Sequence, residues 1–250
     1  MTRELRNVPA SVYDRLRLRA RKRSERVPFV HQRYAAERLL YRLTQSPYRD
    51  RFVLRGAMLY AVWGDEAYRS TSDLDLLGYG SPEPEQIKTC FQDLYAVDVP
   101  DDGLRFQPDS LRVRKVREEA EYSGVEVRLE LRLRTARIRL KVDVGFGDVV
   151  VPGPEEVSFP VLLDGPAPRI RAYSRESVVA EKLHAAALFG DRNTRLKDFY
   201  DLMVLSRVFP FEGNTLAKAI AATFEQRRTR HLWREPNFRS RGKLEVRGGE

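Results

Sequence analysis

The segment Ser72-Asp73-Leu74-Asp75-Leu76-Leu77 places two carboxylates at alternate positions of a predicted strand. Alternate residues of a strand share one face, so Asp73 and Asp75 point the same way, and the leucines beside them are suited to burial on the other face. Mg²⁺ prefers oxygen ligands and binds through one or two carboxylates, completing its shell with water and phosphate. The segment therefore predicts a candidate metal site, for which a solvated strand edge is the alternative interpretation.

A third carboxylate, Asp143, lies in a predicted hairpin further along the chain. Two runs of alternating apolar and polar residues between Gly124 and Gly147 predict antiparallel strands that turn near Thr135-Ala136-Arg137. Asp143 occupies the polar face of the second strand, beside Lys141. If this strand neighbours the one with the paired aspartates, three carboxylates converge, and a divalent cation would offset their repulsion. Taken alone, Asp143 is equally typical of a surface aspartate.

Composition limits the class of protein. The chain has 250 residues, 42% of them hydrophobic, which is enough for a substantial core in one large or two small domains. We expect no membrane segment, because no apolar run has spanning length, and no export signal, because the N-terminal residues lack a hydrophobic stretch. The single cysteine, Cys90, excludes an intrachain disulfide. These features predict a cytoplasmic protein.

The net charge of +9 favours a polyanionic partner such as nucleic acid. Part of this charge lies on an N-terminal amphipathic helix whose apolar side is predicted to be Val12, Leu16 and Ala20. The arginines and lysines on its other side either bind phosphates or simply face solvent.

A helical part near the C-terminus carries a further charged group. Ser174 is a suitable N-cap for a helix over Glu176–Phe189, in which Lys182 lies close to the apolar stripe. A lysine in that position needs an anion, and a nucleoside triphosphate would supply one. Asp198 and Asp201 follow at the start of the next helix, where acids also complement the helix dipole.

The predicted organisation has four parts. Residues 1–50 form an N-terminal helical segment, residues 51–165 a sheet-containing core, residues 170–230 a helical part, and residues 231–250 a disordered tail without amphipathic period. Within the core, Leu104–Arg117 is expected to form a strand pair or an excursion.

Several motifs, taken in order, resemble the nucleotidyltransferase toxins of the AbiEii/AbiGii family, which belong to the DNA polymerase beta-like superfamily. The resemblance covers roughly residues 8–230. The motifs that carry it are Gly56-Ala57, Ser72-Asp73-Leu74-Asp75, Lys141-Val142-Asp143, Val179-Ala180-Glu181-Lys182-Leu183-His184-Ala185 and Arg195-Leu196-Lys197-Asp198-Phe199-Tyr200-Asp201-Leu202.

The resemblance implies an α+β fold: a minimal nucleotidyltransferase core, which is a small mixed sheet with flanking helices, joined to N-terminal and C-terminal helices. It implies an enzyme that transfers a nucleotide from a nucleoside triphosphate, whether ATP, GTP or CTP, to an RNA acceptor, expected to be the 3′ end of tRNA. It also implies the toxin of a type IV toxin-antitoxin or abortive-infection pair, with a helix-turn-helix antitoxin as partner.

The same resemblance assigns roles to residues of the motifs. Asp73, Asp75 and Asp143 would hold Mg²⁺ or Mn²⁺, and Asp143 would also deprotonate or orient the acceptor hydroxyl. The remaining assignments concern the substrates. Gly56, Ala57 and Ser72 would approach the triphosphate, and Lys182 would neutralise its charge. Arg195 and Lys197 would do the same or grip the acceptor, and Asp198 would orient Lys182 or the incoming groups.

Two departures from the family pattern and two alternatives stay open. Ala57 stands where the superfamily usually has serine or a second glycine, so no hydroxyl is available there, and the tail after Arg230 differs from the packed helix expected in relatives. The acceptor is alternatively a protein hydroxyl or a small molecule. The last alternative is a catalytically silent module that binds RNA or a partner protein.

Overall fold

The computed structural model describes residues 7–64, 71, 73–117, 123–189 and 196–229. The helices are α1 (Val8–Lys22), α2 (Val27–Thr44), α3 (Leu59–Trp63), α4 (Pro84–Asp93), α5 (Arg175–Phe189), α6 (Leu196–Val208) and α7 (Gly213–Gln226). Two short 3-10 helices, η1 (Gly56–Met58) and η2 (Leu94–Ala96), precede α3 and follow α4.

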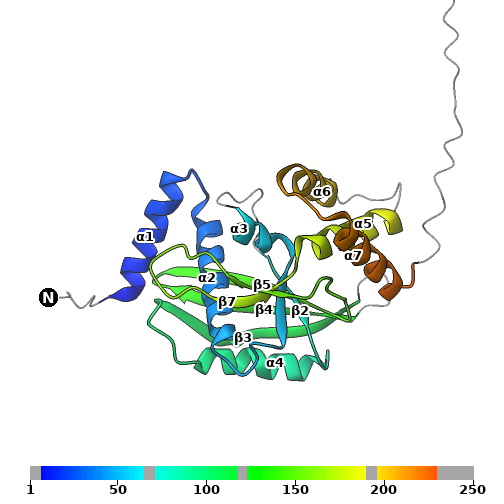
Figure 1. Cartoon of the computed structure of the whole chain (residues 1–250). Coiled ribbons are helices and arrows are strands. Elements are labelled where there is room, and N and C mark those ends of the chain that lie inside the picture. Colours follow the sequence, from blue (N-terminus) through cyan, green and yellow to red (C-terminus); the bar gives the residue numbers. More distant parts are fainter. Residues whose placement is uncertain (1–6, 65–70, 72, 118–122, 190–195, 230–250) are drawn as a thin grey trace, which may run out of the picture.

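A mixed seven-stranded sheet forms the centre of the molecule, in the order β3-β4-β5-β2-β1-β7-β6. The strands are β1 (Phe52–Arg55), β2 (Asp73–Gly78), β3 (Leu104–Arg117), β4 (Ser123–Leu133), β5 (Ala136–Phe146), β6 (Glu155–Ser158) and β7 (Arg169–Ala172). Strand β2 runs parallel to β5 and antiparallel to β1, and β4 runs antiparallel to both β3 and β5. With helices flanking this sheet, the expected α+β class is confirmed (Figure 1).

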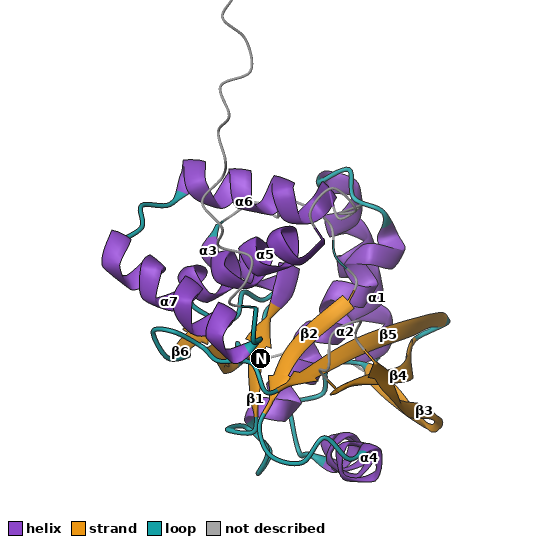
Figure 2. Ribbon diagram, turned by 90° about the vertical axis from the view of Figure 1, so that its right-hand side faces the viewer, coloured by secondary structure: helices purple, strands orange, loops and turns teal. Residues whose placement is uncertain are grey.

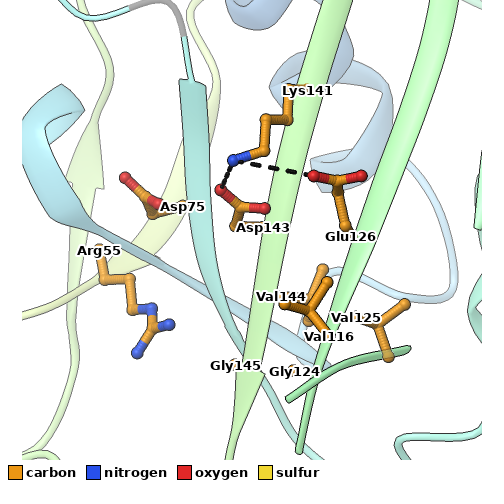
Figure 3. Close-up of a pocket in the computed structure, with 10 residues that line it drawn as sticks. All are labelled: Arg55, Asp75, Val116, Gly124, Val125, Glu126, Lys141, Asp143, Val144 and Gly145. Atoms are coloured by element: carbon orange, nitrogen blue, oxygen red, sulfur yellow. Dashed lines mark hydrogen bonds and ion pairs between the residues drawn. The ribbon is translucent and has the colours of Figure 1, made fainter. Parts of the chain in front are cut away.

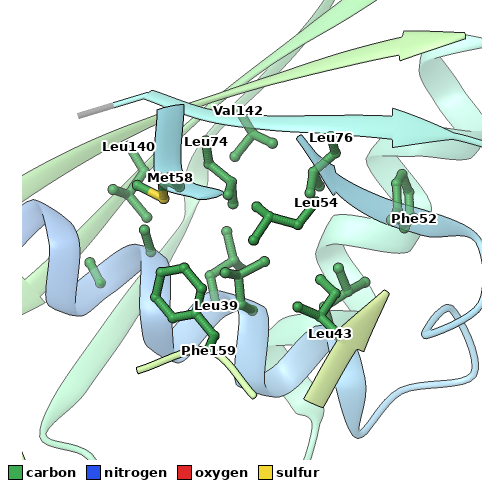
Figure 4. Close-up of a cluster of buried hydrophobic side chains, with 14 of the residues drawn as sticks. Leu39, Leu43, Phe52, Leu54, Met58, Leu74, Leu76, Leu140, Val142 and Phe159 are labelled. Atoms are coloured by element: carbon green, nitrogen blue, oxygen red, sulfur yellow. The ribbon is translucent and has the colours of Figure 1, made fainter. Parts of the chain in front are cut away.

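The hydrophobic core lies between one face of the sheet and α2. The alternation in β2 and β5 directs Leu74, Leu76 and Val142 to this face, where they are buried, and Leu39 and Leu43 of α2 lie opposite them (Figure 4). Because alternate residues of a strand point to opposite faces, the same alternation places Asp73, Asp75 and Asp143 on the other face. The burial of the leucines therefore fixes which side of the sheet carries the carboxylates.

Helix α1 has the predicted amphipathic pattern. Val12, Leu16 and Ala20 are buried, and basic side chains lie on the outer face. The helix starts at Asn7, whose side-chain oxygen accepts a hydrogen bond of 3.1 Å from the amide of Ala10, and Pro9 stands in the first turn, where no amide donor is required.

The C-terminal helices lie at the other end of the molecule from α1 (Figures 1 and 2). Helix α5 contacts both α6 and α7. The expected N-cap of α5 is present, since Ser174 Oγ accepts a hydrogen bond of 3.2 Å from the amide of Ser177. None of the helices within the described ranges is long and apolar enough to cross a membrane.

Three local expectations need correction. Leu104–Arg117 is one long strand with an irregularity between Gln107 and Arg112, because the segments on both sides of the irregularity pair with β4. The hairpin turns at Arg134 and Thr135, because Leu133 pairs with Ala136 and Arg134 takes a positive φ of 53°. The helix expected from Ala57 begins as the 3-10 helix η1. The division into four segments stays a prediction, and its tail, 231–250, lies outside the described residues.

Candidate active site

Strand pairing places the predicted carboxylates in two adjacent rows on the polar face of the sheet. Asp75 of β2 pairs with Asp143 of β5, and Asp143 pairs in turn with Glu126 of β4. In the next row, Asp73 pairs with Lys141. Figure 3 shows Asp75, Asp143, Glu126 and Lys141 around one cavity of about 230 Å³. The sequence-based prediction that the strand of Asp143 neighbours the strand of Asp73 and Asp75 is therefore confirmed.

A lysine ammonium lies among these carboxylates. Lys141 Nζ is 2.6 Å from Asp143 Oδ2, 3.8 Å from Asp73 Oδ2 and 3.9 Å from Glu126 Oε2. Within the described part of the chain, no three Asp, Glu, His or Cys side chains come together as a metal site by themselves. A cation is nevertheless held by oxygens from three strands, and hard carboxylate oxygens are the ligands that Mg²⁺ and Mn²⁺ take. The donor set thus fits a divalent cation.

The carboxylates of the cluster differ in their protonation. Burial raises the pKa of Asp75 to about 6, with Arg55 opposing this rise and Asp143 and Asp73 adding to it. Hydrogen bonds from Arg114 and Arg128 lower the pKa of Glu126 to about 2. A nearby cation favours the ionised form of a carboxylate, so a cation bound in this cluster would lower the raised pKa of Asp75.

Glu126 is a cavity residue that the sequence analysis missed. It was visible only as one polar position in an alternating run, and its side chain is almost buried in the structure. The hairpin turn is the sequence feature that could have identified Glu126. A two-residue loop at Arg134 and Thr135 fixes the pairing of β4 with β5, and this pairing places Glu126 opposite Asp143.

Gly56 brings the backbone against the carboxylate of Asp75. It has a φ of +72°, and a Cβ added to it would lie 2.2 Å from Asp75 Oδ2. The residue before it, Arg55, pairs with Asp75 across the two strands. The next residue, Ala57, is buried at the start of η1. The position therefore needs glycine both for its left-handed backbone and for the close approach.

Replacing Gly56 by alanine is expected to lower the activity that the resemblance implies, nucleotidyl transfer, by about 100-fold, because the new methyl group displaces the Asp75 carboxylate by the order of an ångström. The matched control is Gly80→Ala, since Gly80 has a similar φ of +86° and nothing within 4 Å of an added Cβ. Both variants carry the backbone strain, and only Gly56→Ala crowds the site. Steady-state transfer rates for the two proteins measure the difference, and equal losses would contradict this account of Gly56.

A partly buried ionic network supports the site from the side of the C-terminal helices. Arg55 Nη1 is 2.8 Å from Asp148 Oδ2 and 3.8 Å from Glu181 Oε1. Arg227 Nη2 completes the network at 2.8 Å from Asp148 and 3.4 Å from Glu181. Burial alone would lower the pKa of Arg55, but Glu181 and Asp148 outweigh it and raise the value. The network joins β1, α5 and the end of α7 behind the cavity.

Lys182 lies on a different side of α5 from this network. Its Nζ is 2.8 Å from Asp198 Oδ1 and 2.7 Å from Asp201 Oδ2, and Asp201 is fully buried. The expected contact between Lys182 and Asp198 is therefore present, and Asp201 shares it. As far as the described residues show, Lys182 does not line the cavity of Figure 3.

Of the other predicted phosphate-binding residues, only Lys197 lies within the described part of the chain. Lys197 is exposed at the start of α6. Ser72 and Arg195 lie outside the described residues.

Two solved structures were found in a comparison with this structure. The crystal structure of JHP933 from Helicobacter pylori is 15% identical, with a TM-score of 0.47 over 75% of each chain. A crystal structure from H. pylori described as "putative nucleotidyltransferase" is 15% identical, with a TM-score of 0.46 over 73% of this chain and 70% of that one. No curated protein matches the sequence.

The family is decided by a sequence comparison that spans both the carboxylate strands and the C-terminal helices. The model of the nucleotidyl transferase AbiEii toxin of type IV toxin-antitoxin systems matches residues 38–247. This range is most of the chain and contains every motif on which the resemblance rested. The protein therefore belongs to the AbiEii family of nucleotidyltransferase toxins.

Proposed function

We propose that this protein is a metal-dependent toxin that transfers a nucleoside monophosphate from a nucleoside triphosphate to the 3′ end of tRNA. Membership of a type IV toxin-antitoxin family supports a cognate antitoxin as its partner. The basic net charge supports a nucleic acid acceptor.

One observation carries the proposed metal dependence. Asp75 and Asp143 are directly opposed on parallel neighbouring strands, and the ammonium of Lys141 already lies between Asp143 and Asp73. Carboxylates on adjacent strands form a rigid ligand set, whereas carboxylates on loops would need to be ordered first. A divalent cation entering this cluster would take the place of the Lys141 ammonium, and Lys141 would then be free to contact a phosphate.

In the proposed reaction, Asp73, Asp75 and Asp143 would hold Mg²⁺ or Mn²⁺. When bound, the cation stabilises the attacking and departing oxygens of an in-line displacement. The acceptor hydroxyl oxygen forms a bond to the α-phosphorus, the bond from that phosphorus to pyrophosphate breaks, and Asp143 accepts the hydroxyl proton. The side chain of Asp143 is 32% exposed, so it is accessible for this role.

Other residues are proposed to position the triphosphate. Gly56 is proposed to approach the triphosphate through its backbone alone, because the space where a Cβ would lie is taken by the Asp75 carboxylate. Lys182, which Asp198 and Asp201 hold outside the cavity of Figure 3, is proposed to supply positive charge to the part of the triphosphate that extends beyond it, and Arg195 and Lys197 are proposed to add to this charge. Ala57 contributes only backbone donors, as its side chain has no hydroxyl.

The test is incubation of the purified protein with total cellular RNA, Mg²⁺ and each α-labelled nucleoside triphosphate in turn, with Asp73→Ala as the inactive control. Label on RNA of tRNA size, produced by the wild type and abolished by a chelator, is the expected result. It identifies the nucleotide as well as the acceptor. Label on protein or on small molecules instead would reject the tRNA assignment. Absence of label from a folded protein with every nucleotide would reject transfer itself.

A further inference from the structure

A second hollow adjoins the carboxylate site on the same face of the sheet. It has a volume of about 350 Å³, and its lining includes Asp73, Ser110, Arg128, Arg139 and Lys141. Lys141 also lines the cavity of the carboxylates, so the two spaces meet at this side chain. The second hollow differs in charge, because Arg128, Arg139 and Lys141 outnumber its two acids, Asp73 and Glu130.

The hollow opens onto a basic face made by β3, β4 and β5. Cross-strand pairing places successive arginines side by side: Arg128 pairs with Arg112, and Arg132 pairs with Arg105 and Arg137. The exposed arginines of this face are Arg105, Arg112, Arg114, Arg128, Arg132, Arg137 and Arg139. Two nearly buried acids on the same face, Glu126 and Glu130, pair with several of them. Positive charge therefore predominates outside the carboxylate site.

These arginines remain available to a ligand despite their ion pairs. The side chain of Arg139 is 76% exposed, and its distance from Glu130 is 3.9 Å. The side chains of Arg137 and Arg128 are 61% and 59% exposed. The opposite face of the same strands is apolar and buried in the core. Because core burial fixes the strands, the arginines form a rigid surface, and ion pairs this exposed contribute little to stability.

We infer that this face, defined by Arg128, Arg137 and Arg139 and by the hollow that Arg128 and Arg139 line, binds the backbone of the acceptor RNA. This inference rests on the proposed function. At roughly 3.3 Å per residue, Arg139 lies about 13 Å along β5 from Asp143, which corresponds to about four nucleotides of a stacked strand ending at the carboxylates. The RNA then runs from the acceptor hydroxyl at Asp143, across the hollow, to the tip of the hairpin. Charge complementarity selects a phosphate-rich strand as the occupant.

The experiment compares Arg139→Glu with Arg169→Glu in the full chain. Arg169 is a matched control because its side chain is also 76% exposed, lies on a strand and pairs with a glutamate, but belongs to β7, beyond β2 and β1 in the sheet. Binding of fluorescent tRNA is measured at several salt concentrations. We expect Arg139→Glu to weaken binding by about tenfold or more, and Arg169→Glu by less than about twofold. For Arg139→Ala, the slope of log K against log salt should fall by about 0.7 to 0.9.

Acceptor length gives a second readout. Transfer to tRNA by Arg139→Glu should show a raised KM, whereas transfer to a dinucleotide with a free 3′ hydroxyl should change much less, because a dinucleotide is too short to reach Arg139. Equal weakening by Arg139→Glu and Arg169→Glu would overturn the inference in favour of general charge attraction, and no weakening by Arg139→Glu would place the RNA elsewhere. If the wild-type protein labels a different acceptor and does not bind tRNA, both the proposed function and this RNA-binding surface are rejected. If the wild-type protein binds tRNA and Arg139→Glu binds it equally well, only the surface is rejected.

Discussion

Asp75→Asn is expected to reduce kcat/KM for nucleotidyl transfer by about 1,000-fold while leaving the fold intact. Asparagine has nearly the shape of aspartate, so the close packing against Gly56 is kept. What is lost is the charge that faces Asp143 across the two strands and that would hold the cation. The measurement is the rate of label transfer from the nucleoside triphosphate at saturating Mg²⁺.

A control variant shows whether the loss of activity is specific to a carboxylate of the site or follows from removing any carboxylate of the protein. Asp109→Asn removes an exposed carboxylate from β3 and should leave transfer within about twofold of the wild type. If Asp75→Asn kept more than a tenth of wild-type activity, the carboxylate row would not be the catalytic centre.

The stability of Asp75→Asn provides a second, independent check. Since the pKa of Asp75 is raised to about 6 in the folded protein, its favourable contribution is fully present below the unfolded pKa of 3.8 and is lost as pH rises through 6. At pH 7 the ionised carboxylate is therefore a cost to folding. In a chelator, we expect the free energy of unfolding of Asp75→Asn at pH 7 to equal or exceed that of the wild type by the order of 1 kcal/mol.

The carboxylate strands were accessible to sequence analysis because their pattern is local. Alternation in 73–77 and in 124–147 predicted which residues share a face, and burial of Leu74, Leu76 and Val142 confirms that assignment. Each of these strands needs only its own residues to define its two faces. The position of Glu126 required one further step, the exact hairpin register, which depends on a single turn.

The ionic network was beyond the reach of the same reasoning. Arg55, Asp148, Glu181 and Arg227 come from β1, a loop, α5 and the end of α7, and no spacing in the sequence relates them. Only the family resemblance drew attention to Glu181, which lies beside Lys182 in one of its motifs. In the structure the two side chains have different partners, Arg55 for Glu181 and Asp201 for Lys182. Only the packing of α5 between the sheet and α6 distinguishes their roles.

Arg55→Met is expected to destabilise the protein by about 3 to 5 kcal/mol, because it removes one cation from a buried group of charges and leaves Asp148 and Glu181 with Arg227. The side chains of Arg55 and Asp148 are only 12% and 9% exposed, so solvent cannot replace the lost partner. Arg49→Met is the control: its pair with Glu156 is exposed, and we expect a loss of no more than about 1 kcal/mol. Denaturant unfolding at pH 7 measures both.

Loss of packing provides a different explanation for the same result. The guanidinium of Arg55 lies over Gly145, where an added Cβ would be 2.4 Å from Nη2, so a methionine could leave a gap there. The pH dependence distinguishes the two causes. Burial raises the pKa of Glu181 and Arg55 opposes the rise, so the pKa should climb further without Arg55. A carboxylate with a raised folded pKa stabilises the protein below its unfolded pKa and loses that contribution as pH rises.

The unpaired-charge explanation therefore predicts that Arg55→Met is less destabilising at pH 5 than at pH 8. It also predicts that adding Glu181→Gln to Arg55→Met recovers part of the lost stability at pH 8, because the second substitution removes the charge that lost its partner. A gap over Gly145 would give the same deficit at both pH values and no recovery in the double variant. Arg55 also lies opposite Asp75 in the pairing of β1 with β2. If the double variant recovers stability but not nucleotidyl transfer, the structural contribution of Arg55 is separate from its effect on the carboxylate site.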